Sequence, residues 1–87
     1  MIIDNIVFSE AEYSVSDSFA PFWRITLQCK IEDAEEIEDA LAFMFDVIEW
    51  ERDEDTISVD FDNEADTEEI ALSEFKAKLA QELENGD

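Results

Sequence analysis

The sequence predicts an α+β fold in which an antiparallel sheet of about four strands carries two helices on one face. Three kinds of segment indicate it: stretches where apolar and polar residues alternate, two segments with apolar residues at helical spacing, and short polar turns. The predicted order is strand, strand, helix, strand, strand, helix. We expect residues 1–87 to form a single acidic α+β domain.

The first two strands are predicted over residues 2–13 and 22–31, and the alternation is clearest in the second. Its side chains expected to face the core are Trp23, Ile25, Leu27, Cys29 and Ile31. Residues 14–21 are rich in turn-forming side chains, and Pro21 cannot donate a hydrogen bond to a neighbouring strand. We therefore expect a turn between the two strands.

Two amphipathic helices are predicted, over residues 32–45 and from about Asp66 to Glu84. The apolar side chains expected on the buried side of the first are Ala34, Ile37, Leu41, Met44 and Phe45. Those of the second are Leu72, Phe75, Leu79 and Leu83. Asp66 and Glu69 have the spacing of a capping box at the start of the second helix, and Gly86 would end it.

The remaining strands, over residues 47–52 and 56–62, are predicted to form a hairpin. Their apolar positions, which alternate with acidic or small polar residues, are Ile48, Trp50, Ile57, Val59 and Phe61. Residues 53–55 are all acidic and would form the turn.

Net charge is the property that most distinguishes this chain. Asp and Glu number 26 and Lys and Arg number 5, so the formal net charge at pH 7 is -21. A net charge of about 2–8 in magnitude keeps a small domain soluble, and a larger one opposes compaction by self-repulsion. Hydrophobic residues nevertheless make up 46% of the chain, more than a disordered acidic segment would hold. We therefore predict a folded protein whose acidic surface has a binding role.

No catalytic constellation or cofactor motif is recognisable in the sequence. Histidine is absent and Cys29 has no base beside it, so nucleophilic triads and the usual zinc ligand sets cannot be assembled. A calcium loop starting at Asp60 or Asp62 would put Ala65 or Thr67 at the position that requires glycine. We therefore expect no enzymatic activity, no cofactor and no specific metal site.

The acids are instead predicted to form ladders that compete with nucleic acid for basic rows on a partner protein. Duplex DNA carries one charge per about 1.7 Å of its axis, and proteins hold it with Lys and Arg. Acids two apart in a strand lie about 6.8 Å apart, and acids three or four apart on a helix lie about 5–6 Å apart at Cβ. The residues expected to bind the partner are Glu32, Asp33, Glu35, Glu36, Glu38, Asp39, Glu49, Glu51, Asp53, Glu54, Asp55, Asp60 and Asp62.

The acid runs over residues 31–39 (Ile-Glu-Asp-Ala-Glu-Glu-Ile-Glu-Asp) and 50–55 (Trp-Glu-Arg-Asp-Glu-Asp) give the chain a resemblance to small acidic nucleic-acid mimics. Members of this class, often encoded by phages, block restriction enzymes, repair glycosylases, CRISPR effectors or other DNA-binding proteins. They share size and charge but no fold or motif, so no functional residue is carried over. The resemblance implies a non-catalytic DNA mimic of the anti-CRISPR or anti-restriction type, which would occupy the DNA-binding channel of a CRISPR effector or another DNA-binding complex.

Other functions fit the same composition. An immunity-type inhibitor would plug the active site of a basic nuclease or toxin, with Trp23 or Trp50 as an aromatic contact among carboxylates. Core packing of both tryptophans is the simpler expectation at alternating strand positions. An acidic adaptor domain, or adaptation to high salt, would also enrich acids. We expect a basic protein partner, not nucleic acid or a membrane, and a cytoplasmic location because no signal-peptide pattern is seen.

Overall fold

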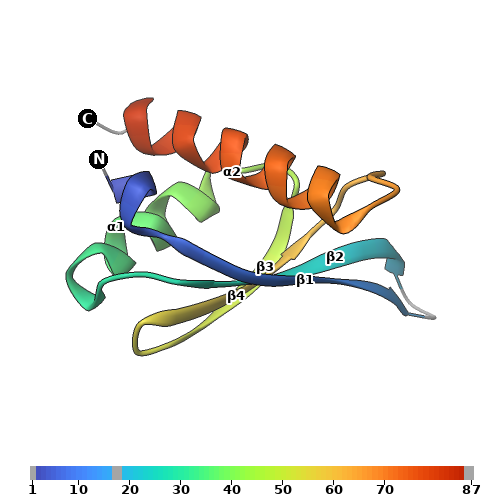
Figure 1. The fold of residues 1–87 in the computed structure, drawn as a ribbon, viewed down its shortest axis with the longest axis horizontal. Helices are drawn as coiled ribbons and strands as arrows, with labels where there is room; N and C mark the ends of the chain where they lie inside the picture. The colour runs from blue at the N-terminus through green and yellow to red at the C-terminus, as the bar shows by residue number, and fades with distance from the viewer. Residues whose placement is uncertain (1, 17–18, 86–87) are drawn as a thin grey trace.

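The computed structural model describes residues 2–16 and 19–85, and its elements follow the predicted order (Figure 1). After a short 3-10 helix η1 (Ile2–Asn5), the elements are β1 (Val7–Ser16), β2 (Phe19–Gln28), α1 (Ile31–Ala42), β3 (Val47–Asp53), β4 (Thr56–Phe61) and α2 (Glu68–Asn85). The four strands form one antiparallel sheet in the order β1-β2-β4-β3. Both helices lie on the same side of the sheet (Figure 1), so the predicted α+β architecture is confirmed.

Alternation along the strands gives the sheet an inner face beneath the helices and an outer face without a covering layer. On the inner face Ile25, Leu27 and Val59 are fully buried. Phe75 of α2 packs edge-on against Phe61 of β4, with ring centroids 5.2 Å apart. The apolar layer between sheet and helices therefore holds the fold together, and it leaves the outer face free for polar side chains.

The N-terminal half of the sheet differs from the prediction in its boundaries. Residues 2–5 form η1, so the first strand begins at Val7, and it continues to Ser16 through part of the predicted turn. Pro21 belongs to β2. It is tolerated there because Pro21 has no partner among the described residues of either ladder: β2 pairs with β4 only from Trp23 onward, and its register with β1 shifts between Phe22 and Phe19.

Two apolar residues assigned to the core are exposed. Ile31 was expected to continue the second strand, but it is the first residue of α1. The chain leaves the sheet just before it, where the Cys29 N–H donates to the Asp55 carbonyl at 2.8 Å. Phe45 was expected on the buried stripe of the first helix, but α1 ends at Ala42 and Phe45 lies outside the core.

The hairpin and the second helix are each shifted by about one residue. The turn contains only Glu54 and Asp55, and β4 ends at Phe61. Thr67, not Asp66, caps α2, because the Ile70 N–H donates to Thr67 Oγ1 at 3.3 Å. The predicted stop at Gly86 lies outside the described residues. Within those residues, no helix combines the length and apolar character needed to cross a membrane.

Candidate protein-binding surface

On the outer face of the sheet, side chains from the four strands fall into rows that run across the strands. Each row begins on the edge strand β1, crosses the central strands β2 and β4, and ends on the edge strand β3. The rows are Glu12–Arg24–Asp60–Glu49, Glu10–Thr26–Ser58–Glu51 and Val7–Gln28–Thr56–Asp53. Acidic residues therefore occupy both edges of this face, and mostly uncharged residues form its middle.

The two acidic edges are well separated. Glu10 and Glu12 line one edge and Glu49, Glu51 and Asp53 line the other, and all five are exposed. Because three inter-strand spacings of about 4.8 Å lie between the edge strands, the two lines of carboxylates are about 14 Å apart. Sequence analysis did not select Glu10 and Glu12, although their alternation with Ala11 and Tyr13 was a usable signal.

The middle of the first row contains a partly buried ion pair. Arg24 Nε lies 2.9 Å from Asp60 Oδ1. The hydrogen bond to Asp60 and the charge of that carboxylate raise the pKa of Arg24, and Glu12 and Glu49 add to the effect. Asp60 is buried and already paired, so it does not form the exposed ladder with Asp62 that was expected; Asp62 lies beyond the end of β4.

The acids of α1 form a second surface. Four of them, Glu32, Glu35, Glu36 and Asp39, are spaced at i, i+3, i+4 and i+7 and are exposed. The opposite side of α1 packs into the core, so this stripe points away from the sheet and does not join the outer face. Of the other two, Asp33 is half-buried, and Glu38 forms an ion pair with Arg52 of β3, with Oε1 3.1 Å from Nε.

The turn residues differ from each other. Glu54 is exposed and has a positive φ of 56°. Asp55 is half-buried and accepts a hydrogen bond from Gln28 Nε2 at 3.0 Å, and this bond lowers the pKa of its carboxyl group. Asp55 therefore joins the hairpin to β2, whereas Glu54 is free to face a partner.

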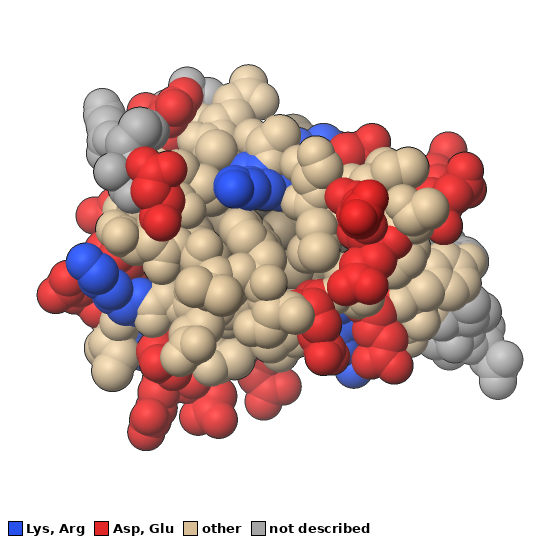
Figure 2. Space-filling view, in the orientation of Figure 1, with Lys and Arg blue, Asp and Glu red and all other residues tan. Residues whose placement is uncertain are grey.

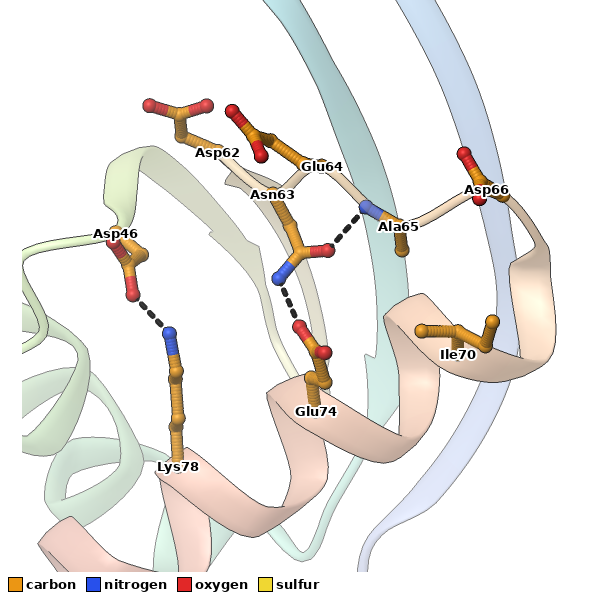
Figure 3. A pocket seen from close by; sticks show the side chains of 9 residues that line it. All are labelled: Asp46, Asp62, Asn63, Glu64, Ala65, Asp66, Ile70, Glu74 and Lys78. Atoms are coloured by element: carbon orange, nitrogen blue, oxygen red, sulfur yellow. Dashed lines mark hydrogen bonds and ion pairs between the residues drawn. The ribbon is translucent and has the colours of Figure 1, made fainter.

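A further acidic cleft of about 550 Å³ lies between the β4–α2 connection, α2 and the start of β3 (Figure 3). Lys78 bridges to Asp46, and the Asn63 side chain bonds both Glu74 and the Ala65 N–H. The remaining acids of this cleft are spread along its rim in Figure 3. Across residues 2–16 and 19–85, no group of three or more His, Cys, Asp or Glu side chains is arranged to hold a metal ion.

The exposed aromatic residues are not the tryptophans. Trp23 is buried and donates from Nε1 to the Ala65 carbonyl at 3.3 Å, and Trp50 packs partly against the core. Core packing, the simpler expectation for both, is thus confirmed for Trp23. Among the residues whose side chains are described, the exposed rings belong instead to Tyr13 of β1 and to Phe43 and Phe45, which follow α1.

The acids are gathered in groups. Figure 2 shows red side chains in separate groups at the left, along the bottom and over the right part of the molecule, with mostly uncharged residues and one blue group of Lys or Arg between them. Comparisons of the chain with protein-family models, with curated proteins and with solved structures find no match. The arrangement of the acids on the outer face of the sheet is therefore the basis on which a function can be proposed.

Proposed function

We propose that this chain is a non-catalytic inhibitor that occupies the nucleic-acid-binding surface of a basic protein by mimicking DNA. The observation that carries the proposal is the outer face of the sheet, with two lines of carboxylates about 14 Å apart on either side of a mostly uncharged floor. The major groove of B-DNA is about 12 Å wide and is bordered by phosphates. A protein that holds phosphates on both sides of the groove would meet carboxylates at a similar separation.

The sheet presents these charges at low entropic cost. Glu49, Glu51 and Asp53 belong to the part of β3 that pairs with β4 without interruption, so their backbone positions are set before binding. The net charge of -21 steers the chain toward a basic surface over several ångströms and makes association fast at low salt.

The target class follows from the resemblance to acidic nucleic-acid mimics. A CRISPR effector or another DNA-binding complex holds DNA in a positively charged channel, which the acidic sheet would enter and block. The alternative of an immunity-type plug anchored by tryptophan has less support, because Trp23 is buried and Trp50 is half-buried.

The test begins with proteins captured from a host lysate and eluted by a salt gradient. Each captured DNA-binding protein is then assayed for DNA binding with and without this chain. Loss of DNA binding, with competition that weakens as salt rises, is the expected result. Captured proteins that keep their full affinity for DNA would contradict mimicry and leave the adaptor function.

Two variants with equal charge changes identify the surface used. The sheet variant carries Glu10→Gln, Glu12→Gln, Glu49→Gln and Glu51→Gln; the helix variant carries Glu32→Gln, Glu35→Gln, Glu36→Gln and Asp39→Asn. Exposed charges are worth about 0.2–1 kcal/mol each, so the loss of four of them should make the sheet variant bind about fourfold more weakly or worse. The helix variant should stay within about threefold of the wild type. Equal losses in both would show that net charge, not the sheet face, governs binding.

A further inference from the structure

Three large apolar side chains are exposed where the chain passes from α1 to β3. Phe45 is fully exposed (103%), Phe43 is 74% exposed and Ile48 is 44% exposed. We call these three residues the apolar corner. A phenylalanine ring hides about 150–250 Å² when it is buried, so leaving two of them in water forgoes much stabilisation. Clustered exposed apolar groups with a polar rim are typical of interaction sites.

The apolar corner is held in place by the surrounding chain. Phe43 and Met44 donate their N–H groups to the carbonyls of Ala40 and Leu41, both at 3.1 Å, which tightens the last turn of α1. Met44 itself is buried. With the backbone fixed on both sides of a buried Met44, the neighbouring phenylalanines are directed outward, and their exposure is not the result of a loose segment.

The start of β3 sets the position of Ile48, the third residue of the apolar corner. The Asp46 carbonyl accepts the Asp62 N–H at 2.7 Å, and the Asp46 carboxylate is paired with Lys78. The ladder with β4 shifts between Val47 and Glu49, so Ile48 is the extra residue of a bulge. Bulges redirect a side chain at functional edges, and here the bulge leaves Ile48 exposed beside the outer face.

The rim of the apolar corner is acidic. Asp39 lies one helical turn before Phe43 and ends the acid stripe of α1, and Glu49 follows Ile48 and begins the acid line of β3. The apolar corner therefore lies between the two acidic surfaces. A second copy of the chain is a poor occupant, because each copy carries a charge of -21 and would repel the other.

We infer that Phe43, Phe45 and Ile48 anchor the protein in an apolar pocket of its partner, bordered by Lys or Arg side chains that meet Glu49. This inference rests on the proposed function for the basic character of the partner, and it adds a contact that a phosphate backbone does not offer. The acids would set the rate of association, and the apolar anchor would slow dissociation and supply specificity.

The test uses two synthetic peptides of about 24 residues as probes. One is an amphipathic helix of Lys and Leu in equal numbers, and the other has every Leu replaced by Ser, so the positive charge is the same. Affinities are measured by calorimetry at low salt and at about 0.3 M salt, where exposed charges are largely screened. The wild type should bind the Lys/Leu peptide at least about tenfold more tightly than the Lys/Ser peptide, and the preference should persist at the higher salt.

The double variant Phe43→Ser/Phe45→Ser removes the anchor and should lose most of this preference, while its affinity for the Lys/Ser peptide stays within about twofold. Ile31→Ser is the matched control, because Ile31 is also exposed beside acids but lies at the other end of α1. It should keep the preference. Both variants alter exposed side chains, and circular dichroism confirms that they fold.

Three results would overturn the inference. The double variant could keep the preference for the Lys/Leu peptide, or the wild type could show no such preference. Sedimentation could also reveal a dimer that the double substitution abolishes, and a second copy would then be the occupant of the apolar corner. A different result would contradict the proposed function alone. In that case the Lys/Ser peptide would not bind at low salt, although the wild type still preferred the Lys/Leu peptide and the double variant did not.

Discussion

Arg24 and Asp60 face each other across two central strands and form a two-point contact on the outer face of the sheet. Nε lies 2.9 Å from Oδ1 and Nη2 lies 3.4 Å from Oδ2. The Asp60 side chain is only 10% exposed, whereas that of Arg24 is 53% exposed. The same guanidinium stands between Glu12 and Glu49 in its row. One arginine thus pairs with one carboxylate and attracts two more from the acidic edges of this face.

Replacing Arg24 with Gln should lower the free energy of unfolding by about 1–3 kcal/mol, because it leaves the Asp60 carboxylate buried without a cation. The loss is smaller than for a fully buried pair, since water already screens half-exposed Arg24. Urea unfolding at pH 7 measures it. The double variant Arg24→Gln/Asp60→Asn should regain more than half of the loss; if it is as unstable as the single variant, the ion pair is not the cause.

The hairpin turn offers a stabilising substitution. Glu54 has a φ of 56°, in the left-handed region where a side chain with a Cβ is strained. Glu54→Gly should raise the free energy of unfolding by about 0.5–1 kcal/mol, the relief of strain being offset in part by greater freedom in the unfolded chain. Urea unfolding of Glu54→Gln provides the control, because it removes the same charge and keeps the Cβ. Equal gains in both variants would mean that charge repulsion, not backbone strain, limits the turn.

The order of elements could be predicted from the sequence because alternation and helical spacing report burial directly. Ile25, Leu27, Phe75 and Leu79 were assigned to the core, and all four are fully buried. Element ends depended on contacts between distant segments. The exposure of Phe45 follows from the end of α1 at Ala42 and from the fixed start of β3, neither of which a local pattern contains.

The sequence predicts that the surface is acidic, but it does not predict how the acids are arranged on the sheet. Counting charges identified Glu49, Glu51 and Asp53, but it did not show that Glu10 and Glu12 line the opposite edge of the same face. That relationship depends on the strand order β1-β2-β4-β3. The partners of individual acids, such as Asp60 with Arg24 or Glu38 with Arg52, likewise arise from pairing between segments far apart in the chain.

Salt should stabilise this protein. With 26 acidic and 5 basic residues, repulsion between carboxylates opposes the folded state, and ions screen it. Calorimetry should therefore give a higher Tm at about 0.5 M NaCl than at low salt. The helix variant of Glu32, Glu35, Glu36 and Asp39 should show a smaller increase, because four repelling charges are gone. An unchanged or lower Tm in the wild type would mean that the acids are locally compensated.

Burial should protect the Cys29 thiol from chemical reagents. The same burial should make the stability of the fold decrease at alkaline pH. Burial raises the pKa of its thiol above the ordinary value of 9.0, and the charges of Asp33 and Asp55 add to the effect. At pH 8 the folded protein should therefore react with a thiol reagent at least about tenfold more slowly than the urea-unfolded chain.

The sign of the pH effect follows from the direction of this shift. As pH rises past 9.0, the unfolded chain loses the thiol proton first, so the folded state binds more protons and its stability falls with pH. Urea unfolding between pH 8 and pH 10 should therefore show a steeper decline for the wild type than for Cys29→Ala, which lacks the group. The two proteins differ only at this side chain, so the difference between the two slopes isolates Cys29. Parallel slopes would mean that the thiol ionises equally readily in the folded and unfolded states.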